Sequence, residues 1–351
     1  MLFRVLPKDE LVSLFEILAI NRIVGPTRKA ISKEGTPIWA FDWLYSFDEL
    51  DFEYTSTSQS PKKYFLPYQE TLSTFTFNKS GWEKSVEYNH YNPTVFFGMH
   101  ACDINALNRL DRVMLESVYP NPFYADKRKN MFIVGVGCVP QQHCFCRSMD
   151  ADSVLHGFDL FLTDIGDRYF IEVQTANAYE ILKHIGATEA TNHEHALFVQ
   201  TVEEKNRRFT CSVDTTDLSK ILDMEFKSEE WVKWGEKCMS CGTCANVCPT
   251  CYCFGIQELV DIDLKGARKE KHLYSCNLVD FAQVAGGHNF RPESHTRLKY
   301  RYYHKHRGFV EAFEESLCVG CGRCGQACLS GITVPEVIGS IRQEAQQNEQ
   351  E

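Results

Sequence analysis

Two groups of cysteines in this sequence repeat one spacing, C-x2-C-x2-C-x3-C. The first group is Cys238, Cys241, Cys244 and Cys248, and the second is Cys318, Cys321, Cys324 and Cys328. A tight turn with a cysteine at every third position supplies three thiolates to a [4Fe–4S] cube, and in two-cluster proteins the fourth cysteine of each group ligates the other cube. We therefore predict two cubes. The ligands would be Cys238, Cys241, Cys244 and Cys328 for cluster 1, and Cys318, Cys321, Cys324 and Cys248 for cluster 2.

Zinc is the alternative, because C-x2-C pairs also build zinc ribbons in structural or regulatory proteins. Structural zinc takes four ligands from two pairs, whereas here a third and a fourth cysteine recur at the same offsets in both groups. This recurrence favours cubes. Two features depart from the ferredoxin pattern: Cys328 is followed by Leu329 instead of proline, and a long insertion, residues 254–317, separates the two groups. The insertion affects the prediction of which loop supplies the fourth ligand of each cube more than the prediction that two cubes are present.

Four further cysteines lie in the N-terminal half, and the elements around them should bring them together. Residues 94–99 (TVFFGM) and 131–137 (MFIVGVG) are apolar runs typical of buried strands, and residues 103–118 have apolar positions at helical spacing. This pattern predicts a βαβ unit, whose parallel strands end at one edge of the sheet. The four cysteines follow these strands: Cys102, Cys138, Cys144 and Cys146.

The same edge of an open α/β sheet is where ligands bind. Cys102 would also lie at a helix N-terminus, where the dipole favours a thiolate. We therefore predict a third [4Fe–4S] cluster held by these four thiols, with zinc as the second interpretation. Free cysteines are often simply buried small side chains, but that accounts less well for a C-x-C pair flanked by His143 and Arg147. His100 is either a substitute ligand or an ordinary histidine at a strand end.

The remaining cysteines leave several interpretations open. Cys211 is isolated in the sequence and is expected to be a packed thiol. Cys251, Cys253 and Cys276 could hold another metal with a histidine such as His288, or could pack around a cube and exclude water. Cys251 could also replace Cys248 in the crossed ligation.

The fold class predicted is α/β and α+β, in two parts. Residues 1–210 form an N-terminal α/β domain, residues 211–230 a linker, residues 231–340 a mostly α-helical two-cluster ferredoxin-like domain with the insertion 254–317, and residues 341–351 a polar tail. Within the first domain we expect irregular α/β structure up to residue 90 and a hairpin formed by residues 158–164 and 168–175. Helical patterns cover residues 8–20, 177–185, 194–209 and 217–226.

Composition limits the class of protein. A chain of 351 residues has room for a large core, so its sixteen cysteines are not needed as disulfide staples. We find no signal-peptide pattern and no apolar run long enough for a membrane span, and expect a cytoplasmic protein in a reducing compartment. The net charge of −10 argues against nucleic-acid binding.

One segment is nevertheless strongly basic. Residues 291–308 (RPESHTRLKYRYYHKHRG) contain these basic residues: Arg291, Arg297, Lys299, Arg301, Lys305 and Arg307. The segment could be a group of cations that raises cluster potentials, a docking surface for a partner subunit, or a solvated face of a helix or strand.

Seven stretches together resemble the iron–sulfur beta subunit of soluble sulfhydrogenase-type [NiFe] hydrogenases and the related iron–sulfur subunit of anaerobic sulfite reductase. They are FFGMHACDINALNRLDR, FYADKRKNMFIVGVGC, CFCRSMDAD, GFDLFLTD, CMSCGTCANVCPTCYCF, AGGHNFRP and CVGCGRCGQAC. The resemblance covers the chain from about residue 60 onward. It implies an electron-transfer subunit with several [4Fe–4S] clusters. Such a subunit works between a catalytic hydrogenase or reductase subunit, which acts on hydrogen, sulfite, sulfur or a disulfide, and a flavin/NAD(P)-binding reductase-type subunit.

What the sequence lacks is consistent with a non-catalytic iron–sulfur subunit. The VGVGC at residues 134–138 has no third glycine at the offset of a dinucleotide-binding loop, so we expect neither an FAD nor an NAD site. His193 and His195 are two residues apart on a predicted helix and do not share a face; we expect both to be solvent-exposed. A stand-alone enzyme is a weaker third interpretation.

Overall fold

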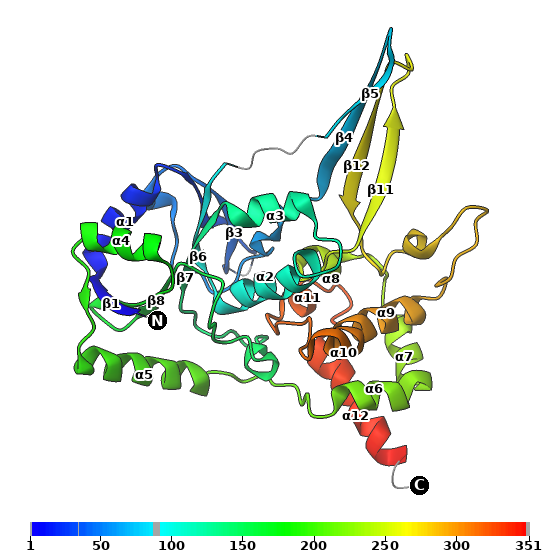
Figure 1. The fold of residues 1–351 in the computed structure, drawn as a ribbon. Coiled ribbons are helices and arrows are strands. Elements are labelled where there is room, and N and C mark those ends of the chain that lie inside the picture. Colours follow the sequence, from blue (N-terminus) through cyan, green and yellow to red (C-terminus); the bar gives the residue numbers. More distant parts are fainter. Residues whose placement is uncertain (1, 34, 87–91, 349–351) are drawn as a thin grey trace.

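A large mixed sheet forms the base of the N-terminal half (Figure 1), in a computed structural model that describes residues 2–33, 35–86 and 92–348. Its eight strands have the order β10-β1-β9-β8-β7-β6-β2-β3. In chain order they are β1 (Leu2–Pro7), β2 (Arg22–Ile31), β3 (Pro37–Leu44), β6 (Thr94–Met99), β7 (Met131–Val136), β8 (Leu160–Asp164), β9 (Arg168–Val173) and β10 (Thr188–Glu189). The central strands β2, β6, β7 and β8 are parallel, and the outer pairings are antiparallel.

The predicted βαβ unit is confirmed. Strands β6 and β7 pair in parallel, and α2 (Ala101–Met114) and α3 (Pro122–Lys129) lie between them in the chain. Every residue of β6 is buried, and α2 buries Ile104, Leu107 and Leu110 in the core beside the sheet. The hairpin is confirmed as the antiparallel pair β8 and β9. The predicted helices are confirmed as α1 (Leu11–Leu18), α4 (Ala176–His184), α5 (Asn192–Arg207) and α6 (Leu218–Met224).

The first ninety residues are more regular than predicted. Strands β1, β2 and β3 belong to the large sheet, while β4 (Gln69–Asn78) and β5 (Gly81–Ser85) belong to a second sheet. Strand β1 pairs with β9, and β2 pairs with β6, so both partners lie far away in the chain. Strand formation here depends on cross-strand partners and burial, which a local pattern of residues does not reveal.

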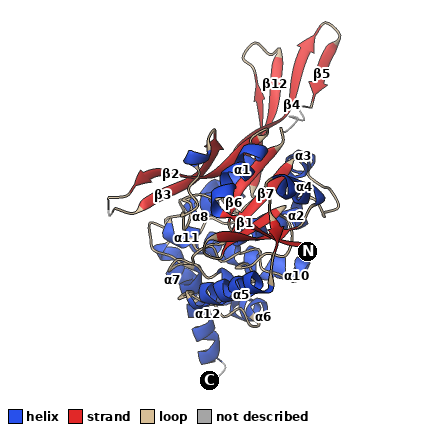
Figure 2. Ribbon diagram, turned by 90° about the vertical axis from the view of Figure 1, so that its left-hand side faces the viewer, coloured by secondary structure: helices blue, strands red, loops and turns tan. Residues whose placement is uncertain are grey.

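The second sheet joins the two halves of the chain. Its order is β11-β12-β4-β5, and β11 (Phe254–Val260) and β12 (Gly266–Leu273) come from the predicted insertion. Strand β12 pairs antiparallel with β4. Figure 1 shows the sheet as an arm that projects from the body, and Figure 2 shows the arm at the opposite end of the molecule from α12.

The cysteine-rich half is mostly helical. Its helices are α7 (Glu230–Lys237), α8 (Thr243–Val247), α9 (Ser294–Tyr303), α10 (Phe309–Phe313), α11 (Arg323–Gln326) and α12 (Val334–Asn348), and a π-helical turn at His304–Gly308 connects α9 to α10. Residues 341–348 of the predicted polar tail continue α12, because Ile341 and Ala345 pack inward; residues 349–351 lie outside the described part. No helix in the described ranges is both long enough and apolar enough to cross a membrane.

Candidate metal centres

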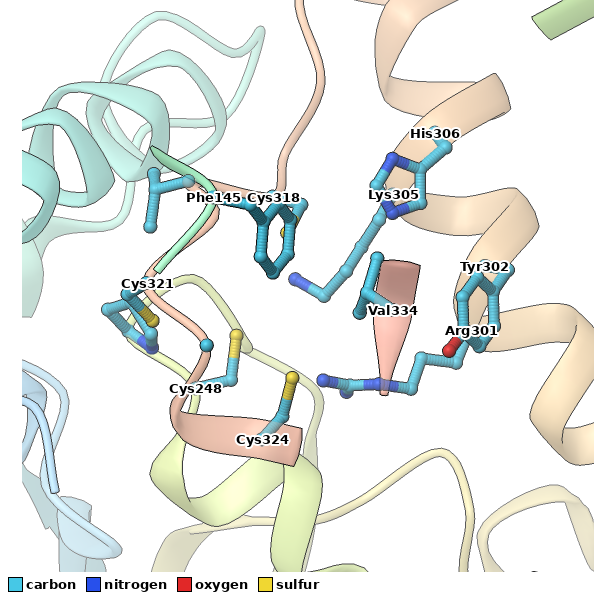
Figure 3. A pocket seen from close by; sticks show the side chains of 13 residues that line it. Phe145, Cys248, Arg301, Tyr302, Lys305, His306, Cys318, Cys321, Cys324 and Val334 are labelled. Atoms are coloured by element: carbon cyan, nitrogen blue, oxygen red, sulfur yellow. The ribbon is translucent and has the colours of Figure 1, made fainter. Parts of the chain in front are cut away.

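The four thiols predicted for cluster 2 line one cavity. Figure 3 shows the sulfurs of Cys248, Cys321 and Cys324 around this space, with the ends of the Lys305 and Arg301 side chains directed toward it. Cys318 supplies the fourth thiol, and the remaining lining is mainly apolar and includes Phe145, Val319 and Val334. Four thiols in a mostly apolar cavity flanked by two cations are a donor set that fits an anionic [4Fe–4S] cube.

Both cysteine loops have the same backbone conformation at equivalent positions. Ser240 and Gly242 in the first loop have φ angles of +52° and +77°, and Gly320 and Gly322 in the second have +64° and +71°. Left-handed residues turn the chain tightly and are accessible mainly to glycine, so the loop can present successive cysteines to one point. Short helices α8 and α11 begin immediately after Gly242 and Gly322.

The thiols predicted for cluster 1 are also neighbours. Burial raises the pKa of Cys238, and the thiols of Cys244 and Cys328 raise it further. Cys241 is exposed, and its thiol raises the pKa of Cys244. The Asn277 side-chain amide donates a hydrogen bond to Cys244 Sγ over 3.2 Å. Cys248 therefore lies with the first three cysteines of the second loop, and Cys328 lies near Cys238 of the first loop, as crossed ligation requires.

The third group gathers at the edge of the large sheet. Cys102 begins α2, Cys138 follows β7, and Cys144 and Cys146 lie in the loop that follows. Burial raises the pKa of Cys146, and the thiols of Cys138 and Cys144 raise it further. Burial, Asp103 and Cys146 all raise the pKa of Cys102. Burial and the adjacent carboxylate thus act against the thiolate form that the helix N-terminus is expected to favour.

A buried ion pair lies between this group and the cluster 2 cavity. Arg323 donates two hydrogen bonds of 2.7 Å to the two carboxylate oxygens of Asp103, and both side chains are almost fully buried. Arg323 follows Cys321 by two residues, and Asp103 follows Cys102 directly. The thiol of Cys321 in turn raises the pKa of both Cys102 and Cys146. Cluster 2 and the third group are therefore adjacent, a relation that the sequence analysis missed.

Two histidines lie beside the third group: His100 is buried and His143 is half-buried. His100 caps α2 and stacks on Tyr54 with ring centroids 4.0 Å apart. Within the described residues, neither His100 Nε2 nor His143 Nε2 has a hydrogen-bond partner. Burial lowers the pKa of His100 to about 3, so its ring is neutral.

The surplus cysteines lie beside the cavities. Cys251 accepts a hydrogen bond from Arg301 Nη1 over 3.1 Å, and Cys248, not Cys251, lines the cluster 2 cavity. Hydrogen bonding with Cys276 lowers the pKa of Cys253. His288 is exposed and packs against Phe290. In the described part of the chain no three His, Cys, Asp or Glu side chains are arranged to hold a single metal ion. Cys211 packs beside the helical core, as predicted for an isolated thiol.

Three of the six basic residues in the basic segment belong neither to a solvated face nor to a docking surface. Arg297, Arg301 and Lys305 are buried. Arg297 donates to Ser240 Oγ in the first cysteine loop, and Lys305 donates to Thr250 Oγ1 over 2.8 Å. The docking and solvated-face interpretations are therefore wrong for these three residues, because the chain folds their side chains inward toward the thiols.

The other basic residues of this segment face away from the cavity. Lys299 donates to the carbonyl oxygen of Phe226, and Arg307 pairs with Asp223 and Glu311. Arg291 stacks over the ring of Tyr300.

Lys62 is a further buried cation that the sequence analysis missed. Its ammonium donates to the carbonyl oxygens of Ala245 and Cys251, 3.2 Å and 3.0 Å away, although it lies far away in the chain. No motif marks it.

Of the two histidines expected at the surface, His193 is exposed, but His195 is half-buried and packs edge-on against Phe3 and Phe170.

Comparison with known proteins places this geometry in a class. Residues 237–332 match the family model described as a 4Fe-4S dicluster domain. Over 328 residues the chain is 34% identical to sulfhydrogenase 2 subunit beta of Pyrococcus furiosus, an alignment that covers 92% of this chain and 93% of that protein. No solved structure matches the chain.

The cysteine-rich half is therefore a 4Fe-4S dicluster domain, the class of iron–sulfur protein that its two repeated loops define. The match over nearly the whole chain then gives the family: this protein belongs to the sulfhydrogenase beta subunits.

Proposed function

We propose that this protein is an electron-transfer subunit with three [4Fe–4S] clusters. Cluster 1 would be held by Cys238, Cys241, Cys244 and Cys328, cluster 2 by Cys318, Cys321, Cys324 and Cys248, and cluster 3 by Cys102, Cys138, Cys144 and Cys146. The observation that carries the proposal is the cavity at cluster 2, where one loop's fourth cysteine joins the other loop's first three.

The neighbour relations among the thiols support a linear order, with cluster 2 in the middle. Between clusters 1 and 2, the thiol of Cys248 raises the pKa of Cys244, and the thiol of Cys244 raises the pKa of Cys324. On its other side, Cys321 acts on Cys102 and Cys146 of cluster 3. Electrons would pass one at a time along this series, and the chain's own residues would hold the clusters, exclude water and set their potentials.

The family supports partners at the two ends of this series. The relative's name makes it one subunit of a sulfhydrogenase. We propose that one end receives electrons from, or returns them to, a flavin/NAD(P)-binding subunit, and that the other end serves a catalytic hydrogenase or reductase subunit.

The test is the metal content of the full chain purified without oxygen. We expect a brown protein with about twelve iron and twelve sulfide per chain, about four of each per cube. Electron paramagnetic resonance of the reduced protein should show interacting [4Fe–4S] signals. A colourless protein with stoichiometric zinc and no sulfide would contradict the proposal and favour the zinc-binding alternative.

A further inference from the structure

Several buried cations in this protein have no carboxylate partner. The basic side chains buried in the described part of the chain are Lys62, Arg109, Lys271, Arg297, Arg301, Lys305 and Arg323. Three of them are ion-paired: Arg109 with Glu315, Lys271 with Glu70, and Arg323 with Asp103. The other four have no ion pair with a carboxylate in the described ranges. Arg297 donates to backbone carbonyl oxygens and to Ser240 Oγ, which leaves Lys62, Arg301 and Lys305.

These three unpaired cations converge on the cysteines between clusters 1 and 2. Lys305 donates to Thr250 Oγ1, which lies 3.4 Å from Cys248 Sγ. Arg301 donates through Nη1 to Cys251 Sγ and through Nη2 to the carbonyl oxygen of Cys244, each over 3.1 Å. Lys305 and Arg301 both line the cluster 2 cavity (Figure 3).

An isolated buried charge is costly unless an opposite charge or hydrogen bonds compensate it. Burial acts to lower the pKa of Lys305, but the sulfurs of Cys248 and Cys251 outweigh burial and raise it. Lys305 lines the cavity of the four thiols predicted for cluster 2, and a cube held by four thiolates carries net negative charge. Of the three cations, Lys305 has the most direct connection to a predicted ligand of cluster 2, through Thr250.

We propose that Lys305 is the counter-ion that sets the reduction potential of cluster 2. This inference rests on the proposed function. Reduction adds an electron to an already anionic cluster, so a fixed positive charge beside it stabilises the reduced state and raises the potential. Cluster 2, in the middle of the series, would thereby accept electrons more readily than it would without Lys305.

The experiment compares the unmodified full chain with Lys305→Met, which removes the charge and keeps much of the stem. Each protein is purified anaerobically, its iron is measured, and its clusters are titrated with a redox mediator series followed by electron paramagnetic resonance. We expect unchanged iron and a shift of one cluster's midpoint potential to a more negative value, with the other two potentials moving much less. Lys305→Arg keeps the charge and should restore most of the shift.

Lys299→Met is the matched control, because Lys299 lies in α9, which runs directly into the π-helical turn that carries Lys305. The ammonium of Lys299 donates to the carbonyl oxygen of Phe226 and lies over the ring of that residue. Its potentials should equal those of the unmodified chain. An unchanged set of potentials in Lys305→Met, or an equal shift in Lys299→Met, would overturn the proposal. If Lys305→Met loses a cube, Lys305→Gln is titrated instead. Loss of the same cube from both neutral variants would show a role in assembly and also overturn the proposal.

The two proposals fail in distinguishable ways. Absence of iron from the unmodified chain refutes the proposed function. Full iron, together with cluster midpoint potentials that are the same in Lys305→Met and in the unmodified chain, refutes only the inference about Lys305.

Discussion

Sixteen cysteines share one side-chain chemistry, but their surroundings in the fold differ. Cys248, Cys318, Cys321 and Cys324 line a common cavity. Cys251 is paired with Arg301, Cys253 is hydrogen-bonded with Cys276, and Cys211 packs beside the helical core. The difference between a ligand and a neighbour therefore depends on which sulfurs share a space, and it can be tested one residue at a time.

Replacing Cys144 by serine should remove one cube. The side chain lies with Cys138 and Cys146 in the third group, and a hydroxyl is a much poorer ligand for iron than a thiolate. We expect iron to fall by about four atoms per chain while the two clusters of the repeated loops keep their spectra. Cys211→Ser is the control, because it removes a half-buried thiol outside all three groups. Full iron in Cys144→Ser would refute the third cluster.

Replacing Cys253 by serine should leave the iron content nearly unchanged. Its thiol is hydrogen-bonded with Cys276 and does not line the cluster 2 cavity. Serine keeps the size and a hydrogen-bonding group, so packing is preserved. Iron analysis that finds about four atoms fewer would make Cys253 a ligand and our assignment wrong.

At the scale of elements, the second cysteine loop is fitted against the loop that carries Cys144 and Cys146. A Cβ added at Gly320 would lie 2.5 Å from the carbonyl oxygen of Phe145 and 2.6 Å from Cys146 Cα. The backbones of the two loops are therefore in direct contact, and Phe145 donates its N–H to the carbonyl oxygen of Gly320 over 2.9 Å. The residues proposed to hold clusters 2 and 3 therefore meet at this junction.

Gly320→Ala should disturb both clusters, whereas Gly331→Ala should disturb neither. Both glycines have positive φ, +64° and +65°, but a Cβ at Gly331 meets nothing within 4 Å. The left-handed conformation costs alanine roughly 1 to 2 kcal/mol at either site, and overpacking adds roughly 1 to 3 kcal/mol at Gly320. Thermal unfolding and iron content measure the two effects. Equal stability and iron in both variants would contradict the close contact of the loops.

On the scale of the whole molecule, clusters and fold should stabilise each other, because the cations around clusters 1 and 2 have no carboxylate of their own. Removing iron with a chelator would leave Lys62, Arg301 and Lys305 buried together with less anionic charge than a cube supplies, because only Cys248, whose pKa these cations help to hold well below its usual value, remains as a counter-charge. An uncompensated buried charge costs about 3 to 5 kcal/mol, and each kcal/mol shifts Tm by roughly 2 °C or more in a domain of this size class. We expect the cluster-free chain to unfold at least about 5 °C below the loaded one.

The direction in which one variant changes the unfolding temperature gives a further test of this prediction. Lys305→Met removes one of three buried cations that the thiolate of Cys248 compensates only in part, so in the cluster-free state it should unfold at a higher temperature than the unmodified chain. In the loaded state it should have no such advantage. Calorimetry of the four preparations measures this difference, and the same ranking of the two chains in both states would contradict a counter-ion role.

The sequence by itself determined the chemistry and the local elements. The offsets in the two cysteine loops indicated cubes, and the residue pattern around 94–138 predicted the βαβ unit that brings Cys102 and Cys138 to one edge of the sheet. These inferences depend on spacing within one segment, which local backbone geometry converts directly into positions in space.

Only the tertiary structure decided what lies between the segments. Lys62, the Arg323–Asp103 pair and the pairing of β12 with β4 connect residues far apart in the chain. The same is true of Arg301 and Lys305. The sequence of the basic segment is equally compatible with exposure to solvent, and only the fold shows that these two side chains are buried. The sequence shows that a charge exists, but its energy depends on burial and on partners within a few ångströms, which only the folded chain specifies.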